Sequence, residues 1–474
     1  MARITWLIVF MFSLFLDTEN VSAQSFFRHH GGVAIDDSAA LPGRFDENDK
    51  VLWKQDLLPG HSTPCLFGDF LFVTTYDPTE RELATVALHQ DTGKILWSRV
   101  VKPNVIEPYH ADGSPAASSV ACDGQRVYAF FGSYGLLCYD MQGELIWSKQ
   151  MGPFQDEFGA ASSPVLADGK VILNEDHDVG SFLIAIDQQT GETIWRVDRS
   201  EFTRSYATPA FLSHGGKNEI VVAGAVELVA YDITDGRKRW WVTGLSRLVD
   251  STPVVNDGRL YLATWSMGGD QEDRLSMKSF TEALKEYDRD GNGRIAKSEL
   301  KKGPVLRRFF RIDTSGDQEL DQQEWKRQAR VFELAQNVAM AIEPGGSGDV
   351  TDTHVKWIYR RGLPVVPSPL VYQNVFYMIK NGGILTSLDA ETGTLIKQGR
   401  VGQGGNYFAS LVAGDGKVYV ASDRGEVTVV KAEGQWEIIS SHDFGARIMA
   451  TPAIGNGKIF IRTDDAVHCF VAKN

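Results

Sequence analysis

Oxygen-bearing groups occur at a fixed spacing between residues 288 and 299. They are the side chains of Asp288, Asp290, Asn292 and Glu299 and the main-chain carbonyl of Arg294. Gly293 supplies the sharp turn that such a loop needs. A calcium ion takes about six to eight oxygen ligands, and a glutamate at the end of the loop can provide two of them. We therefore predict that this loop binds Ca²⁺.

A second loop with the same pattern begins at residue 313. Its candidate ligands are Asp313, Ser315, Asp317, Glu319 and Glu324. Gln318 occupies the place of the turn glycine, so the backbone there must adopt a conformation that glycine adopts more easily. Both loops have the spacing of EF-hand calcium loops, in which Ile295 and Leu320 would pair. We predict a compressed EF-hand pair with a weaker second site; the alternative is that the second loop is only structural.

Helices must hold these two loops, and the surrounding sequence predicts them. Between Glu272 and Glu333 the chain carries 13 acidic and 14 basic residues, a sharp change in composition. Phe280, Leu284 and Tyr287 recur at helical spacing within this segment. We expect residues 268–341 to form a small α-helical insertion.

The rest of the chain is built from a short repeat, and its best copy runs from Ala185 to Trp195. Ala185 and Asp187 lie two residues apart, as on one face of a strand. Thr190-Gly191 forms a turn, and Trp195 belongs to the next strand. Further copies run from Ala87 to Trp97, from Cys138 to Trp147, from Ala230 to Trp240 and, without the tryptophan, from Ser387 to Lys397.

A Ser/Thr-Pro pair precedes the copies and sets their period. The anchors are Pro64, Pro164, Pro209, Pro253, Pro369 and Pro452, with degenerate copies centred on Ser119 and Leu411. Successive anchors are 55, 45, 45, 44, 116, 42 and 41 residues apart, so there are eight units and one contains the insertion. A period of about 40–50 residues with four short strands per unit is typical of β-propellers. We predict an all-β, eight-bladed β-propeller with the insertion in its fifth blade.

The repeat Ala-x-Asp-x-x-Thr-Gly-x-x-x-Trp resembles the tryptophan-docking motif of propellers of the pyrroloquinoline quinone (PQQ) type. The resemblance covers about residues 50–265 and 340–474. This group includes quinoprotein dehydrogenases and the outer-membrane assembly factor BamB, and both are typically eight-bladed. The resemblance implies that each tryptophan docks between neighbouring blades. The combination of a propeller with an EF-hand insertion resembles proteins of bacteria, so we expect a bacterial source.

Both ends of the chain carry patterns that assign them a role. Arg3, the apolar run from residue 4 to residue 16 and the small residues 21–23 predict a cleavable signal peptide over residues 1–23. The mature chain would then be periplasmic or secreted. The first cysteine is Cys65, so the lipoprotein anchor that the resemblance to BamB implies is not expected. Residues 24–48 look like a loose leader, and residues 49–267 and 342–474 would form the propeller. The segment around Trp53 should complete the blade that residues 459–471 begin, which closes the ring.

Charged and aromatic residues gather in the loops that precede the anchors. The resemblance places these loops at a funnel around the central axis. They contribute His61, Tyr109, His110, Asp112, Glu157, Phe158, Arg204, Tyr206, Arg247, Asp250, Asn406, Tyr407 and Arg447. Such a mouth could bind a protein or peptide, and the alternative is a solvated rim. No subset of them has a spacing that demands a nucleophile, a base or a metal.

Composition narrows the classes of function. A net charge of −13 and a pI near 5.3 argue against a general nucleic-acid binder. No other apolar run is long enough to span a membrane, and the four cysteines are expected to be small buried residues. We predict a monomeric, extracytoplasmic, calcium-binding scaffold without catalytic residues. The alternatives are a PQQ-dependent oxidoreductase with its site in the funnel and a hydrolase or lyase at the same place.

Overall fold

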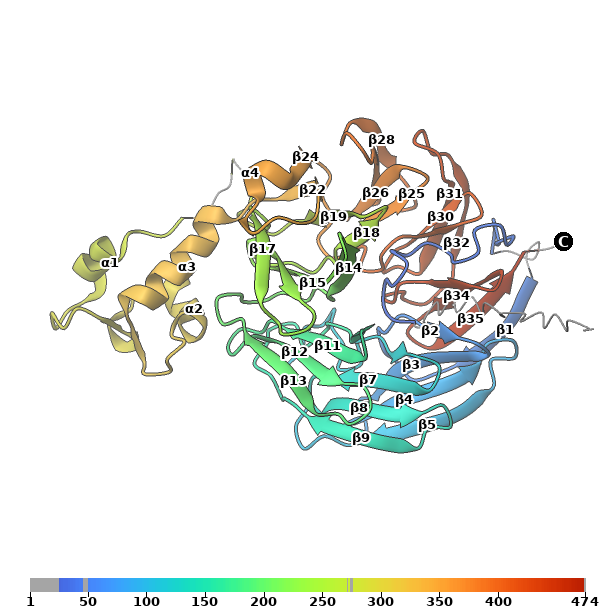
Figure 1. Ribbon diagram of the computed structural model, residues 1–474, viewed down its shortest axis with the longest axis horizontal. Coiled ribbons are helices and arrows are strands. Elements are labelled where there is room, and N and C mark those ends of the chain that lie inside the picture. Colours follow the sequence, from blue (N-terminus) through green and yellow to red (C-terminus); the bar gives the residue numbers. More distant parts are fainter. Residues whose placement is uncertain (1–24, 46–49, 271, 273–275, 473–474) are drawn as a thin grey trace, which may run out of the picture.

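The computed structural model describes residues 25–45, 50–270, 272 and 276–472. Eight antiparallel sheets are arranged as blades around a central axis (Figure 1). The predicted eight-bladed β-propeller is therefore confirmed. The signal peptide predicted for residues 1–23 lies outside the described residues.

The first four blades follow one another along the chain, each built from four strands in sequence order. Blade 1 contains β2 (Cys65–Phe67), β3 (Phe70–Asp77), β4 (Glu82–His89) and β5 (Ile95–Val101). Blade 2 contains β6 (Ala121–Cys122), β7 (Arg126–Phe131), β8 (Gly135–Asp140) and β9 (Leu145–Gln150). Blade 3 contains β10 (Val165–Ala167), β11 (Lys170–Glu175), β12 (Phe182–Asp187) and β13 (Thr193–Asp198). Blade 4 contains β14 (Ala210–His214), β15 (Lys217–Gly224), β16 (Glu227–Asp232) and β17 (Lys238–Thr243), and β23 (Gly348–Asp349) pairs with β17 in parallel.

Among the remaining blades, blade 5 is interrupted by the insertion and blade 8 joins strands from both ends of the described chain. Blade 5 contains β18 (Val254–Asn256), β19 (Arg259–Thr264), β22 (Val338–Ile342) and β24 (Val355–Tyr359), with a short helix α4 (Thr351–His354) before its last strand. Blade 6 contains β25 (Leu370–Tyr372), β26 (Val375–Lys380), β27 (Ile384–Asp389) and β28 (Leu395–Arg400). Blade 7 contains β29 (Val412–Gly414), β30 (Lys417–Ala421), β31 (Glu426–Lys431) and β32 (Ile438–Asp443). Blade 8 contains β33 (Ala453–Gly455), β34 (Lys458–Arg462), β35 (Ala466–Val471) and β1 (Lys50–Asp56).

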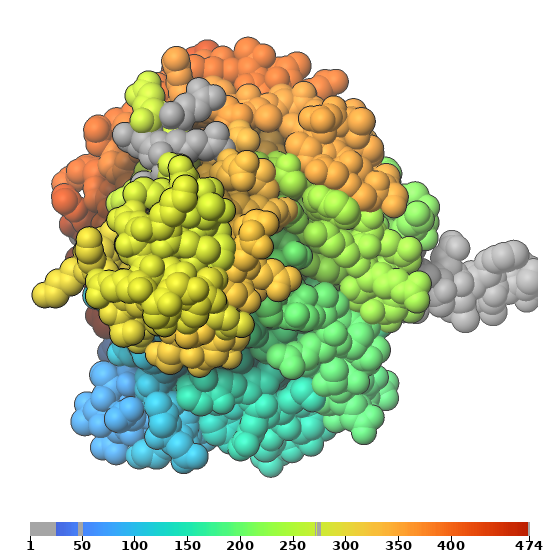
Figure 2. Space-filling view, turned by 90° about the vertical axis from the view of Figure 1, so that its left-hand side faces the viewer, coloured from blue at the N-terminus to red at the C-terminus, as the bar shows by residue number. Residues whose placement is uncertain are grey.

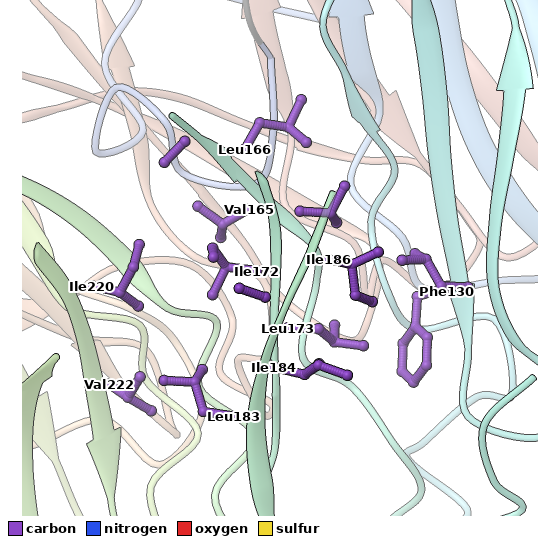
Figure 3. Packing of buried hydrophobic residues seen from close by; sticks show 14 of the residues in the cluster. Phe130, Val165, Leu166, Ile172, Leu173, Leu183, Ile184, Ile186, Ile220 and Val222 are labelled. Atoms are coloured by element: carbon purple, nitrogen blue, oxygen red, sulfur yellow. The ribbon is translucent and has the colours of Figure 1, made fainter. Parts of the chain in front are cut away.

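The repeat motif forms the outer hairpin of a blade, and its aspartate holds the turn. In blade 3, Asp187 Oδ1 accepts hydrogen bonds from the main-chain N–H groups of Gln189 and Thr190, each at 2.8 Å. The apolar residues of β10 to β12 meet those of β7 and β15 in the neighbouring blades (Figure 3). The core therefore lies between blades, where the inner faces of adjacent sheets bury each other.

Each docking tryptophan packs against the turn glycine of the next blade, as the resemblance implied. The pairs are Trp53 with Gly93, Trp97 with Gly143, Trp147 with Gly191, Trp195 with Gly236 and Trp357 with Gly393. A Cβ on Gly191 would lie 2.7 Å from the Trp147 ring, so the close approach itself requires glycine there. The indole N–H of Trp195 also donates to the Ile233 carbonyl of the next blade at 3.0 Å.

Two positions depart from this docking pattern. Trp240 donates its indole N–H to Glu219 of its own blade at 3.0 Å. Lys397 stands where blade 6 lacks the tryptophan, and its ammonium lies 4.2 Å from the ring centroid of Trp436. The indole of Trp436, from the next blade, therefore replaces part of the contact that the missing tryptophan would make.

A second contact links the blades near the axis. It joins the hydroxyl-bearing anchors Thr63, Ser119, Ser163, Thr208, Thr252, Ser368, Ser410 and Thr451. Seven hydrogen bonds of 2.9–3.2 Å run from the main-chain N–H of one anchor to the side-chain hydroxyl of the next. The Ser/Thr of the sequence marker is therefore explained by its position in this hydroxyl ring.

Residues from both ends of the described chain close the propeller. Strand β1 pairs antiparallel with β35, and Trp53 stands opposite Cys469. The predicted closure of the last blade is therefore confirmed. The four cysteines, Cys65, Cys122, Cys138 and Cys469, are free and buried, as expected.

The prediction of a loose leader for residues 24–48 was wrong for residues 25–45, which are packed against the propeller. Ser25 forms a bridge with Cys122 of blade 2, and Val33 forms one with Ala413 of blade 7. The buried Arg28 guanidinium donates to the Leu411 carbonyl at 2.8 Å. Phe45 packs edge-on against Phe470 of blade 8, with ring centroids 5.0 Å apart. Three of these four contacts join residues more than 300 positions apart, so no local pattern indicated them.

The insertion leaves the propeller after β19 and returns at β22, inside the fifth blade. It contains α1 (Phe280–Tyr287), β20 (Ile295–Ala296), a 3-10 turn η1 (Lys297–Glu299), α2 (Pro304–Ile312), β21 (Glu319–Leu320) and α3 (Gln322–Leu334). Phe280, Phe309 and Trp325 belong to its own small core. Figure 1 shows this unit standing out from the edge of the ring, and Figure 2 shows it in front of the blades. Among the described residues, no helix is long and apolar enough to cross a membrane.

Replacement of Trp195 by alanine should lower the free energy of unfolding by about 3–5 kcal/mol, the range for a buried aromatic side chain. Trp195 is 8% exposed, whereas its neighbour Ile194 is 44% exposed in the same strand. Ile194→Ala is therefore the matched control and should have a much smaller effect. Chemical denaturation of both variants measures the difference. A loss below about 1 kcal/mol for Trp195→Ala would contradict a stabilising role of the docked ring.

Candidate functional site

An axial cavity of about 490 Å³ lies inside the hydroxyl ring. Eight of the predicted funnel residues line it: His61, His110, Asp112, Phe158, Tyr206, Arg247, Asp250 and Asn406. The hydroxyl ring contributes Thr63, Ser119, Ser163, Thr208, Thr252, Ser368, Ser410 and Thr451. Phe27 of the leader also lines the cavity, and the neighbouring leader residues lie against the innermost strands of blades 1 and 8. The leader therefore covers the axial cavity on the side opposite to the funnel loops.

The other five predicted funnel residues do not line the cavity. They are Tyr109, Glu157, Arg204, Tyr407 and Arg447. Sequence reasoning missed Phe27, Trp265, Met267, Asn381, Phe408 and Met449. Trp265 directly follows β19 rather than preceding an anchor, and Phe27 belongs to the leader. A rule that also included the residues after the second strand of each blade would have found Trp265.

The charged residues of the cavity wall differ in how they are compensated. Burial lowers the pKa of His61 to about 3, with Arg462 and Arg447 adding to the effect, so its imidazole is neutral at physiological pH. The Arg247 guanidinium donates to the Met267 carbonyl at 2.7 Å. Asp112 lies 3.4 Å from His110 Nδ1 and 3.6 Å from Arg447 Nη2.

A buried ionic cluster lies behind the wall formed by Tyr206. The Tyr206 hydroxyl donates to Asp156 Oδ1 at 2.5 Å. The two ring nitrogens of His177 lie 3.3 Å from Asp156 Oδ2 and 2.9 Å from Glu175 Oε2. Burial alone would lower the pKa of His177, but the two carboxylates outweigh it and raise this pKa to about 10. The imidazolium therefore neutralises part of the buried negative charge.

The insertion touches the funnel rim through Arg311. Its guanidinium lies 2.8 Å from Glu157 Oε2 and 2.9 Å from Asp178 Oδ1. Arg204 Nε reaches the same Asp178 oxygen at 2.6 Å. Arg330 of α3 pairs with Glu227 of blade 4, and Val331 packs against Val226. The rim and the insertion therefore share one network of ion pairs and a small apolar contact.

In the first loop of the insertion, the structure brings three of the predicted ligands together. One carboxylate oxygen each from Asp288, Asp290 and Glu299 lies within 4.8 Å of the others. Main-chain N–H groups hold these side chains in place. Glu299 Oε1 accepts from Arg289 N at 2.7 Å, and Asp288 Oδ2 accepts from Gly293 N at 3.0 Å. Asn292 Oδ1 accepts from the main-chain N–H of Arg294 at 2.7 Å.

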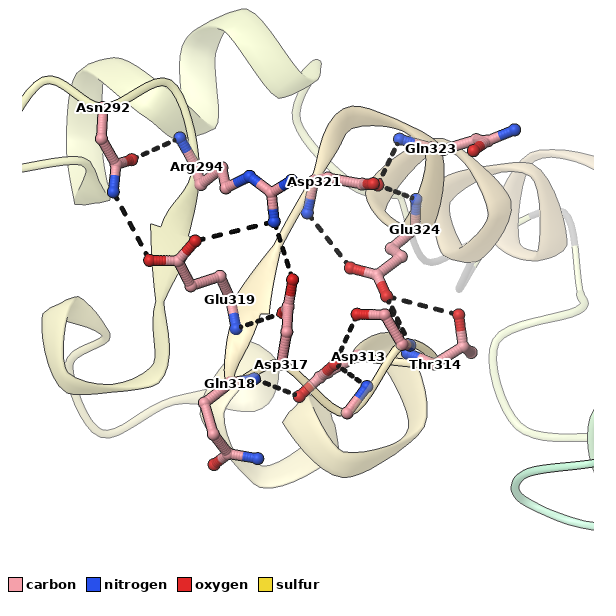
Figure 4. A network of polar contacts seen from close by, with 12 residues as sticks. Asn292, Arg294, Asp313, Thr314, Asp317, Gln318, Glu319, Asp321, Gln323 and Glu324 are labelled. Atoms are coloured by element: carbon pink, nitrogen blue, oxygen red, sulfur yellow. Dashed lines mark hydrogen bonds and ion pairs between the residues drawn. The ribbon is translucent and has the colours of Figure 1, made fainter.

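The second loop is wound in the same way but is crossed by a side chain from the first (Figure 4). Asp313 Oδ2 accepts from Gln318 N at 3.0 Å, and Glu324 Oε1 accepts from Ser315 N at 2.9 Å. Gln318 has φ of 69°, so the glutamine adopts the left-handed conformation expected at the glycine place. Strands β20 and β21 pair Ile295 with Leu320.

The crossing side chain is that of Arg294, the residue whose carbonyl is a predicted ligand in the first loop. Its Nη1 lies 2.7 Å from Asp317 Oδ2 and 3.6 Å from Glu319 Oε2. These two carboxylates are predicted ligands of the second loop. An arginine therefore already compensates two of the acidic groups that a cation would use there.

The fold and cavity define a class of protein: a tryptophan-docked, eight-bladed propeller with an axial cavity. A model of the family "Outer membrane protein assembly factor BamB" matches residues 41–176 and 181–281, together half of the chain. The chain belongs to the BamB family.

Individual relatives are distant. The outer membrane protein assembly factor BamB of Yersinia pestis is 24% identical over 392 residues, which cover 77% of this chain and 83% of the relative. The crystal structure of BamB from Moraxella catarrhalis has a TM-score of 0.56 at 13% identity and covers 90% of this chain and 98% of that one. A europium-containing methanol dehydrogenase has a TM-score of 0.51 at 10% identity, covering 88% and 86%. The two structural likenesses, at these identities, show a common fold only.

Replacement of Arg311 by glutamine should loosen the insertion without unfolding the propeller. Hydrogen bonds to charged groups are worth about 1.5–3 kcal/mol, which corresponds to roughly ten- to hundredfold faster local opening. Hydrogen exchange of the α2 amides measures this opening. Arg307→Gln is the matched control, because Arg307 is an exposed residue of the same helix with no ion pair to the described part of the chain. Equal exchange rates in the two variants would contradict docking through Arg311.

Proposed function

We propose that this chain is a calcium-binding, non-catalytic scaffold that works outside the cytoplasm and binds a partner protein at its axial cavity. Three features support the proposal. The relatives are named as outer membrane protein assembly factors, the first 23 residues have the pattern of a signal peptide, and the funnel loops converge on one cavity. The partner site follows from the cavity, and the calcium sites follow from the insertion.

The observation that carries the calcium proposal is the convergence of Asp288, Asp290 and Glu299 within 4.8 Å. Like charges at this distance repel one another, and a divalent cation relieves the repulsion. The main-chain N–H groups already fix the winding of the loop, so binding requires little rearrangement. Extracellular calcium modules commonly have dissociation constants of about 10⁻⁴–10⁻³ M. A structural role for Ca²⁺ is therefore favoured over a signalling role.

The residues of the cavity do not fit the quinone of the alternative, oxidoreductase function. PQQ is a flat polyanion that needs a stacking aromatic and several cations. Trp265 could provide the aromatic surface. The pKa of His61 is lowered to about 3 by burial, Arg247 is bonded to a carbonyl, and Asp250 places a carboxylate in the same cavity. The carboxylate of Asp250 would therefore repel the polyanion, and the lining does not supply the several cations that its charges need.

Replacement of Glu299 by glutamine should raise the dissociation constant for Ca²⁺ at the first loop by about tenfold or more. The change removes one negative charge and weakens a ligand that can supply two oxygens. Titration calorimetry compares the variant with Glu286→Gln, which makes the same charge change on α1 outside both loops. The wild type should also lose thermal stability on addition of a chelator, because a ligand of the folded state stabilises it. Equal affinities in the two variants, or a melting temperature that ignores the chelator, would contradict the proposal.

Replacement of Arg294 by glutamine should strengthen Ca²⁺ binding at the second loop and leave the first loop nearly unchanged. The first loop uses only the main-chain carbonyl of this residue, whereas the side chain occupies Asp317 and Glu319 of the second. Calorimetry should resolve a second binding event with an affinity up to about fivefold higher than in the wild type, since removal of a competing surface ion pair, worth up to about 1 kcal/mol, frees two carboxylates. Lys285→Gln on α1 is the control for loss of one positive charge. A second site equally weak in both variants would show that Arg294 does not limit it.

A further inference from the structure

Asp250 is the one carboxylate of the cavity wall that has no ion pair among the described residues. Its side chain lines the axial cavity, and it has no hydrogen bond or ion pair to any described residue. Burial raises the pKa of Asp250 to about 7, and the neighbouring carboxylate of Asp156 adds to the shift. Ionisation of Asp250 costs free energy in these buried surroundings, and a cation beside the carboxylate would offset that cost.

The other charged groups in or beside the cavity are engaged or neutral. Asp112 contacts His110 and Arg447, and the Arg247 guanidinium is held by the Met267 carbonyl. His61 is neutral because burial lowers its pKa. Asp156, behind the wall, accepts from the Tyr206 hydroxyl and contacts His177. Asp250 is therefore the one carboxylate of this wall without a partner among the described residues, whereas Arg247, the one guanidinium of the wall, is already hydrogen-bonded.

The surroundings of Asp250 are suited to the apolar part of a ligand. The main-chain N–H of Tyr206 donates to the carbonyl of Val249 at 2.8 Å, so Tyr206 runs alongside Asp250. Phe158 packs edge-on against Tyr206, with ring centroids 5.8 Å apart, and both rings line the cavity together with Trp265. Aromatic faces attract organic cations and also cover alkyl chains. Phe27 covers the cavity on the leader side, which favours a chain end or side chain entering from the funnel.

We propose that the axial cavity binds an organic cation, an ammonium or guanidinium group on an apolar stem, with Asp250 as its anion and Tyr206 and Trp265 as its aromatic walls. The inference deepens the proposed function and rests on it for the place where the partner binds. A lysine or arginine side chain presented by a partner protein has this chemistry. A free alkylamine has it as well.

The test uses short peptides that differ at one central residue, either lysine, norleucine or glutamate, in an otherwise identical apolar sequence. Calorimetry on the full chain should show the lysine peptide binding at least about tenfold more tightly than the norleucine peptide, since a desolvated cation–π and ion-pair contact exceeds 1.4 kcal/mol. In Asp250→Asn this ratio should fall to near one. Asp112→Asn is the matched control, because Asp112 lines the same cavity but is paired, and it should keep the preference.

The outcomes separate this inference from the proposed partner site. Equal binding of all three peptides by the wild type overturns the cation site and leaves a partner site in place. A lysine preference that survives in Asp250→Asn also overturns it. Binding of n-butylamine without any peptide binding supports the cation site and rejects the protein partner. No binding of peptides or n-butylamine overturns both. If Asp250→Asn does not fold, the ratio of the lysine-peptide affinity to the norleucine-peptide affinity is measured on the wild type alone. A ratio near one then still overturns the cation site.

Discussion

The contact between a tryptophan and the turn glycine of the next blade is the constraint on which the rest of this structure depends. A four-stranded sheet has two apolar faces and cannot bury both by itself. In this chain Trp195 covers Gly236 of the next blade and donates to Ile233 there, so each blade is completed by its neighbour. The hydroxyl ring repeats the link near the axis. Neighbouring blades are therefore joined twice, at the outer hairpin by the tryptophan and near the axis by the hydroxyl ring. This arrangement places the blades around the axis and leaves the axial cavity between them.

Closure adds a second constraint, because a ring of blades has no natural first or last member. Strand β1 completes the blade that β33, β34 and β35 begin, which removes a free sheet edge. The leader then crosses the ring from blade 2 to blade 8 and inserts Phe27 toward the axis. Burial lowers the pKa of Arg28 to about 9, but main-chain carbonyls of blades 6 and 7 satisfy its guanidinium. The leader thus stabilises the ring and also covers the axial cavity on one face only.

Most of the fold could be predicted from the sequence because a propeller repeats its information. Turn glycines, aspartates and Ser/Thr anchors recur at a regular period, and each makes the same kind of local contact in several blades. The elements that were missed make contacts that occur once. The leader meets residues hundreds of positions away, and Trp265 reaches the cavity from the end of a strand. The side chain of Arg294 was also missed, because a spacing rule assigns a role to its carbonyl only. Local patterns determine the blades, whereas unique long-range packing determines what the cavity contains.

The insertion connects the two candidate sites through one short helix. Arg311 of α2 pairs with Glu157 and Asp178 at the funnel rim. Asp313, the first predicted ligand of the second loop, caps the same helix, and its main-chain N–H donates to the Phe309 carbonyl at 2.9 Å. Arg311 and Asp313 therefore lie within one turn of each other, where α2 meets the second loop. Arg294 pairs with Asp317 in that loop. The ion pair of Arg294 with Asp317 and the contacts of Arg311 with the funnel rim therefore lie on one short segment of the chain, residues 311–317.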